Sequence, residues 1–433
     1  MSPIIEILLL LAGVVAGIIL SISVFRLHPA IALGLAAIIT GFVLGFDIPT
    51  IMNALYSGFR NVVLGVGIVI ILGAVLGTLM EHSGAMDTII SYVLRIFGRD
   101  RPLTSLSVLG LVVGIPVFCD SGFIILSRVA NGMADQNGIK RRYTAMALAG
   151  GLYTAHTLIP PTPGPVAAAG NLGMGGELGL VLGSGLLVSI PILLVLIMGT
   201  TWLSRNHRQQ TIGHPENLVP HAALLLPVLA AMILISLGSV ASALHEGELP
   251  LWMSIVVHPV TALFIGTMIA WFQIGVEKRK FTLWKKGTAD ALPIVLITGM
   301  GGAFGQVLKE SSLSTSLSET FITSGGTFAH LLLIGFTGAL IIKTAQGSST
   351  AAIVITSSIL FPLTGGLSGW ETALLISAIG SGAMAISHAN DSYFWVVSKF
   401  SDLSVRESYQ YFSVLTLVLG LTGFVSCWIL SLI

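Results

Sequence analysis

The sequence has few charged residues. Only 9% of its 433 residues are Asp, Glu, Lys or Arg, whereas charged residues make up about 25% of an ordinary soluble domain. The 20 basic residues nearly balance the 19 acidic ones, and the resulting net charge of +1 gives no field that would attract nucleic acid or an acidic surface. The scarcity of charge therefore argues against a soluble protein and excludes a nucleic-acid binder.

Cysteine and enzyme motifs are also scarce. The two cysteines, Cys119 and Cys427, lie in apolar sequence and are too few for a disulfide framework or a cysteine-rich metal site. The sequence contains no nucleotide-binding loop, dinucleotide fingerprint, metal-ligand cluster or local nucleophile–base pair. We therefore expect no cofactor, no metal and no enzymatic activity, and a pump driven by nucleotide hydrolysis is disfavoured.

Long apolar runs are abundant. Hydrophobic residues make up 54% of the chain and glycine contributes 50 residues, which suits closely packed membrane helices. A membrane helix needs about 20 apolar residues to cross the bilayer. The runs of that length cover residues 4–25, 29–46, 61–80, 178–203, 219–244, 251–274, 288–308 and 409–433. The sequence predicts an all-α, multi-pass membrane protein, whose first run is a retained span because no basic residue precedes it.

Four further apolar segments are interrupted by residues that disfavour a continuous helix. Residues 103–134 and 327–361 each consist of two short apolar legs around a polar tip, which predicts a hairpin. Residues 143–175 contain four prolines within six positions, and residues 371–398 contain the polar stretch 387–392. Proline removes a backbone donor, and non-helical backbone at membrane depth must line protein or water. We therefore expect two re-entrant hairpins and two broken helices around a cavity.

Basic loops orient the chain, because short cytoplasmic loops collect Lys and Arg. The basic loops fall at residues 95–101, 140–142, 205–208, 278–286 and 399–406. With all of them inside, both termini are expected outside. The hairpin over 103–134 then enters from the cytoplasm and the hairpin over 327–361 enters from outside.

The two halves of the chain have the same order of elements. Residues 1–210 contain spans, the cytoplasmic hairpin, the broken helix 143–175 and the span 178–203; residues 215–433 contain spans, the external hairpin, the broken helix 371–398 and the span 409–433. Gly73 and Gly77 match Gly301 and Gly305 at a constant offset. Opposite insertion of two such halves predicts an inverted-repeat secondary transporter with its substrate near the midplane.

Polar residues at the four interruptions are the candidate site. A carboxylate such as Asp120 is costly inside a membrane and is a functional candidate for that reason. The start of a helix after the second tip presents free N–H groups to an anion. The expected proton-coupling residues are Asp120, His156 and His388. The expected substrate contacts are Ser121, Gly122, Thr162, Lys343, Gln346, Gly347, Ser348, Ser349, Thr350, Asn390 and Asp391.

Structural roles remain open for several of these side chains. Asp120 could pair with Lys343 or Arg128, His156 could be a packed helix residue, and Asp391 could be a capping group. Membrane Ser and Thr residues also bond to their own helix or hold helices together.

Three motifs carry a resemblance to a known family. Residues 114–123 (GIPVFCDSGF), 156–165 (HTLIPPTPGP) and 387–394 (SHANDSYF) resemble the gluconate permease (gluconate:H+ symporter) family of bacteria, and the likeness runs over nearly the whole chain. The resemblance implies proton-coupled uptake of gluconate or a related small acid across the cytoplasmic membrane. It also implies membership of the ion transporter superfamily, whose members form homodimers with an elevator-like moving domain. Relatives within the family carry other sugar acids or D-serine.

The expected mechanism places the substrate carboxylate at residues 346–350 near Lys343, while a proton on Asp120 removes a charge that would repel the anion. Sodium coupling and another small carboxylate or D-serine as substrate are the alternatives. An intramembrane enzyme with Ser121 as nucleophile and His156 as base is a remote one. The expected partners are a small anionic substrate, the lipid bilayer and a second copy of the chain.

Overall fold

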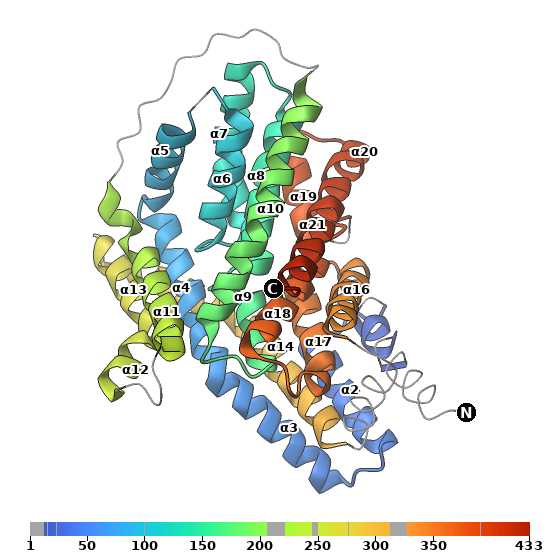
Figure 1. The fold of residues 1–433 in the computed structure, drawn as a ribbon. Helices are drawn as coiled ribbons and strands as arrows, with labels where there is room; N and C mark the ends of the chain where they lie inside the picture. Colours follow the sequence, from blue (N-terminus) through green and yellow to red (C-terminus); the bar gives the residue numbers. More distant parts are fainter. Residues whose placement is uncertain are drawn as a thin grey trace.

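The computed structural model describes residues 13–14, 16–22, 24–98, 100–205, 221–244, 250–275, 277–311, 327–389 and 391–433. Within these ranges the chain is helical and contains no strand (Figure 1), which confirms the all-α prediction. Half of the expected span over residues 4–25 lies outside the described residues, as do the N-terminus and Asn390.

The first half contains nine numbered α-helices among its described residues. They are α2 (Pro29–Val43), α3 (Ile48–Val62), α4 (Ile68–His82), α5 (Ala85–Phe97), α6 (Pro102–Gly114), α7 (Cys119–Asn137), α8 (Arg141–Leu158), α9 (Pro163–Asn171) and α10 (Leu178–Ser204). A π-helical turn, η1 (Val63–Gly67), joins α3 to α4, so that residues 48–82 form one long helical segment.

The second half follows with a similar series. Its described α-helices are α11 (Leu226–Leu244), α12 (Leu251–Val257), α13 (Pro259–Gln273), α14 (Glu277–Glu310), α16 (Phe328–Gln346), α17 (Ser349–Leu360), α18 (Gly369–Met384), α19 (Ser392–Phe400), α20 (Val405–Glu407) and α21 (Val414–Leu430). A second π-helical turn, η5 (Ser408–Ser413), precedes α21.

The structure differs from the expected spans in several places, and the span expected over residues 61–80 is part of the longer helical segment 48–82. Residues 251–274 were expected to form one helix, but α12 and α13 are bent by 57°. The bend falls where Pro259 cannot continue the backbone hydrogen bonds and His258 caps the new helix by accepting from the N–H of Val260. The short helix α5 was not predicted, because its apolar residues alternate with Asp87 and Arg95 and form no long run.

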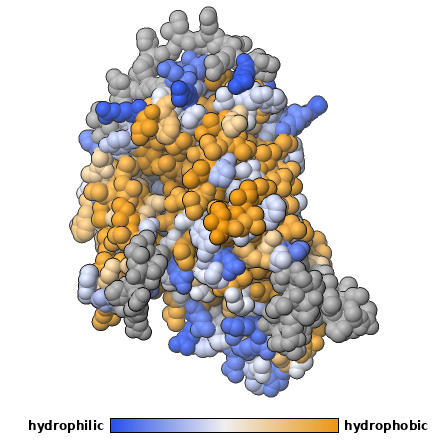
Figure 2. Space-filling view, in the orientation of Figure 1, coloured by the Kyte–Doolittle hydropathy of each residue, from blue (hydrophilic) through white to orange (hydrophobic). Residues whose placement is uncertain are grey.

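The described surface suits a lipid environment. Hydrophobic residues gather in a band across the middle of the visible face, and hydrophilic residues lie toward its two ends (Figure 2). Large apolar side chains such as Ile39, Met198 and Trp202 are exposed in this structure, which is favourable in hydrocarbon. By length and composition, five described helices could cross a membrane, or six if the bent pair counts as one span.

Interrupted helices of the two halves pack against each other around α8. Every α8 residue from Tyr143 to Leu158 is buried. The α9 residue Asn171 donates to the Val354 carbonyl at 3.1 Å and to the Ser357 hydroxyl at 2.9 Å, both on α17. This packing brings the helix breaks of both halves together, which positions the site described next.

Candidate functional site

One cavity of about 320 Å³ lies where these interrupted helices meet, within the usual size range of small-molecule sites. Its walls come from the start of α7, the second half of α8, the turn between α16 and α17, and the start of α19. The lining residues are Phe118, Cys119, Asp120, Tyr153, His156, Gln346, Gly347, Ser348, Ser349, Thr350, Asp391, Ser392 and Tyr393.

Three helices begin at this cavity. α7 starts at Cys119, α17 at Ser349 and α19 at Ser392, and all three residues line the cavity. The first N–H groups of a helix have no acceptor within the helix, and its dipole is positive at that end. On α17 the Ser348 side chain accepts from the N–H of Ala351, which leaves the earlier N–H groups at the cavity. The arrangement favours an anionic ligand.

The breaks in the second half form because their sequences end one helix and cap the next. Gly347 ends α16 with a positive φ of 82°, a conformation that glycine adopts without strain. Ser348 then caps α17, and the Asp391 side chain caps α19 by accepting from the N–H of Tyr393.

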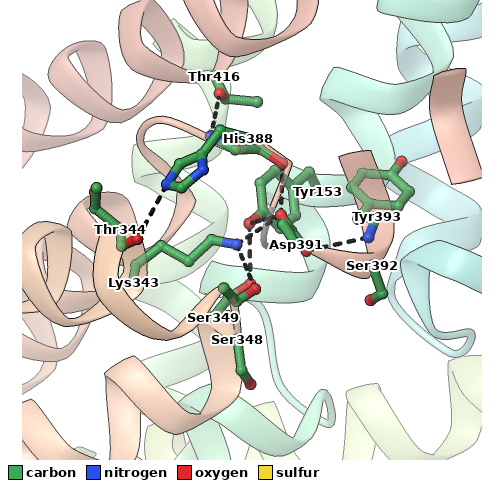
Figure 3. Close-up of polar contacts among 12 residues, drawn as sticks. Tyr153, Lys343, Thr344, Ser348, Ser349, His388, Asp391, Ser392, Tyr393 and Thr416 are labelled. Atoms are coloured by element: carbon green, nitrogen blue, oxygen red, sulfur yellow. Dashed lines mark hydrogen bonds and ion pairs between the residues drawn. The ribbon is translucent and has the colours of Figure 1, made fainter. Parts of the chain in front are cut away.

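Asp391 also holds a buried polar network (Figure 3). Its Oδ2 atom accepts from the Lys343 Nζ atom at 2.6 Å, from the Ser387 hydroxyl at 2.5 Å and from the Tyr153 hydroxyl at 3.4 Å. Lys343 donates in addition to the Gly347 carbonyl at 2.7 Å. The charge of Lys343 is therefore compensated, and the network ties the α16–α17 turn to the start of α19.

The break before α19 has its backbone groups satisfied by side chains. Thr416 accepts from the N–H of Ser387 at 2.9 Å, and Ser413 donates to the carbonyl of Ser387 at 2.5 Å. The hydroxyl of Tyr409 accepts from the N–H of Ala389 at 3.4 Å. Such partners are required for non-helical backbone inside a membrane, and they fix the position of Asp391.

Asp120 lacks a cationic partner among the residues that the structure describes. Its carboxylate accepts from the Ser392 hydroxyl at 3.5 Å and from the Cys119 thiol at 3.9 Å. Of the ion pairs within the described ranges, none includes Asp120 or the exposed Arg128. Asp120 is therefore a cavity carboxylate whose charge no ion pair compensates within the described part of the chain.

Two cavity side chains have unpaired polar atoms. The His156 ring stacks on Tyr153 at 6.5 Å between centroids and is tilted against Phe118 at 6.2 Å. His156 is 8% exposed, and its Nδ1 atom has no hydrogen-bond partner among the described residues. Both amide atoms of Gln346 are likewise buried without a partner there. Buried polar atoms are normally bonded, so these atoms indicate a place for a polar ligand or water.

The structure brings most of the sequence-predicted residues to this cavity, but not all of them. Lys343 is shielded behind Asp391, and His388 Nε2 lies 3.0 Å from the carbonyl of Thr344 (Figure 3). The Thr162 hydroxyl donates to the Ile159 carbonyl at 2.6 Å. Ser121, Gly122, Thr162, Lys343 and His388 are not part of the cavity lining. Asn390 lies outside the described residues.

Sequence reasoning missed five lining residues. They are Phe118, Cys119, Tyr153, Ser392 and Tyr393. One signal could have identified Tyr153: it lies three positions before His156 in a helix, a spacing that puts two side chains on the same face.

Comparisons with known proteins cover almost the entire chain. The model of the GntP family permease matches residues 5–433. A gluconate permease of Pseudomonas aeruginosa is 30% identical over 97% of this chain and 96% of its own length. The inner membrane permease YgbN of Escherichia coli is 31% identical over 99% of each chain. The D-serine transporter DsdX of Escherichia coli K12 is 28% identical over 96% of each chain.

Proposed function

Because the chain belongs to the GntP family of permeases, we propose that it takes up gluconate or a closely related small sugar acid together with a proton. The family and the relatives are permeases, which points to a transporter rather than an enzyme. The apolar helices and the inner-membrane relative indicate a multi-pass protein of the inner membrane. The observation that carries the proposal is the cavity at which three helices begin beside the uncompensated carboxylate of Asp120.

The anionic group of the substrate binds at the start of α17 in this proposal. The N–H groups of Ser349 and Thr350, which line the cavity, are without acceptors inside the helix and suit a carboxylate. The charge of Lys343 is paired with Asp391, so Lys343 acts by holding the α16–α17 turn rather than by binding the substrate directly. Hydroxyl and amide groups around the cavity then bind the remainder of a hydroxylated acid.

Asp120 carries the coupled proton in this proposal. An ionised Asp120 repels an incoming carboxylate, whereas a protonated Asp120 does not and can donate a hydrogen bond. Proton and anion therefore bind better together than separately, and each raises the affinity of the other by the same factor. The cycle needs no cofactor, because the proton is the coupling ion.

The proposal also includes the architecture of the transport cycle. Residues 1–210 and 215–433 form inverted repeats with both termini outside. Residues 103–134 and 327–361 form the re-entrant hairpins, which move with the broken helices as an elevator in a homodimer. The support is the corresponding order of interrupted helices, α6–α9 in the first half and α16–α19 in the second.

Uptake by the purified protein in proteoliposomes tests the function. We expect an inward proton gradient to drive accumulation of radiolabelled gluconate, and unlabelled sugar acids to compete. Accumulation driven by a sodium gradient, with the proton gradient collapsed, would show that sodium and not the proton is the coupling ion. Competition by D-serine alone would identify an amino-acid carrier like the relative that bears that name.

A further inference from the structure

We infer that His156 and Gln346 select the substrate by its hydroxyl groups, and that His156 does so as a neutral ring rather than as the proton carrier. The inference rests on the proposed function and adds the part of the site that distinguishes a hydroxylated acid from a plain carboxylic acid. Both residues line the cavity, and both have buried polar atoms without a partner in the described part of the chain.

The His156 ring is held in one orientation. It stacks on Tyr153 with an interplanar angle of 16° and is tilted by 56° against Phe118. Tyr153 is itself fixed, because its hydroxyl lies 3.0 Å from the Ser349 hydroxyl and 3.4 Å from Asp391. A ring fixed in this way can bond a ligand in the cavity with little loss of side-chain freedom on binding.

A neutral ring fits these surroundings better than a charged one. His156 is buried, and a buried charge is costly unless an opposite charge pairs with it. Asp391 already bonds Lys343. Nδ1 of His156 lies buried without any hydrogen-bond acceptor in the described residues. A neutral imidazole provides one donor and one acceptor, which matches a hydroxyl group.

Gln346 provides the complementary groups. It is the last residue of α16, directly before the turn that leads to the proposed carboxylate site on α17. Its amide offers two donor hydrogens and one acceptor oxygen, and a hydroxyl group can satisfy either kind. A ligand without hydroxyl groups leaves these atoms unpaired. Sites built to bond a hydroxyl group strongly reject analogues that lack it.

The test measures how strongly two unlabelled acids of six carbons, gluconate and hexanoate, inhibit the uptake of radiolabelled gluconate in proteoliposomes. The variants are His156→Phe, which keeps a ring between Phe118 and Tyr153, and Gln346→Met, which keeps the length of the side chain. His82→Phe is the matched control, because His82 lies at the end of α4 and bonds the Thr78 carbonyl outside the cavity. His156→Gln restores hydrogen-bonding atoms.

We expect each cavity variant to lose affinity for gluconate by on the order of tenfold, the effect of one lost hydrogen bond. Inhibition by hexanoate should change much less, and His156→Gln should recover part of the loss. Accumulation at saturating gluconate should still follow the proton gradient in His156→Phe. The control should behave as the unmodified protein.

Two results would overturn the inference while the proposed function stands. Equal losses of affinity for gluconate and for hexanoate in a cavity variant would indicate that the replaced residue has a structural role. Normal gluconate affinity without proton-driven accumulation in His156→Phe would make His156 a coupling residue. A failure of the unmodified protein to take up gluconate would instead overturn the proposed function, and this inference with it, before any variant is compared.

Discussion

The Lys343 Nζ atom lies 2.6 Å from the Asp391 Oδ2 atom, and the two side chains are only 1% and 5% exposed. The pair joins the last turn of α16 to the cap of α19. Removing one partner of a buried ion pair leaves an uncompensated charge and costs about 3–5 kcal/mol, whereas replacing both partners by apolar residues is often tolerated. The ion pair therefore fixes the α16–α17 turn relative to the start of α19, and each of its two side chains needs the other.

This dependence predicts strong non-additivity between the two positions. Lys343→Met and Asp391→Leu should each lower the stability of the purified protein by about 3 kcal/mol, and the double variant should be more stable than the sum of the single losses predicts. Thermal unfolding in detergent, analysed as a double-mutant cycle, measures the coupling. Additive losses would show that the pair does not stabilise the site.

Replacing Asp120 should separate transport of the substrate from its coupling to the proton. Asp120→Asn keeps the size of the side chain but cannot gain or lose the proton, so proton-driven accumulation should be abolished while exchange of gluconate across the membrane continues. Asp120→Glu should retain part of the accumulation. Uptake and counterflow in the same proteoliposomes measure both. An Asp120→Asn protein that still concentrates gluconate against its gradient would remove Asp120 from the coupling mechanism.

The helix breaks were predictable because they arise from local chemistry. Prolines between residues 160 and 165 cannot continue a helix, and the structure ends α8 at Leu158 and begins α9 at Pro163. The left-handed Gly347 followed by the cap Ser348 is a similar local signal. Each of these breaks depends on a few neighbouring residues, and sequence patterns contain that information.

The partner of Lys343 was not predictable from the sequence. Both Asp120 and Asp391 were available, and only the packing of α19 beside the α16–α17 turn decides for Asp391. The contacts of Tyr153 were not predictable for a related reason. Its hydroxyl bonds Ser349 and Asp391, which lie far away in the chain, and no local pattern predicts these contacts.

The contact between α4 and the α6–α7 turn depends on the absence of a side chain at Gly77. A Cβ atom on Gly77 would collide with the Pro116 carbonyl oxygen, whereas a Cβ atom on Gly199 of α10 would meet no atom within 4 Å. Gly77→Ala should therefore lower stability by about 1–3 kcal/mol through overpacking. Gly199→Ala should be neutral or stabilising by up to about 1 kcal/mol, because alanine favours helices. Thermal unfolding of both variants measures the difference, and equal behaviour would show that the α6–α7 turn moves aside freely.

Substrate should protect Ser392 from chemical labelling. Ser392 is exposed and lines the cavity beside Asp120, so a thiol at this position should react with a water-soluble maleimide. In a background with Cys119→Ser and Cys427→Ser, we expect gluconate to slow labelling of Ser392→Cys several-fold at saturating concentration, because the bound acid excludes the reagent.

The matched control for this labelling is Asn53→Cys, because Asn53 is exposed on α3 and outside the cavity lining. Its labelling rate should not change with gluconate. Protection at both positions would indicate a global conformational change instead of direct occupation. Labelling of Ser392→Cys at an unchanged rate, in a protein that still transports gluconate, would place the substrate elsewhere.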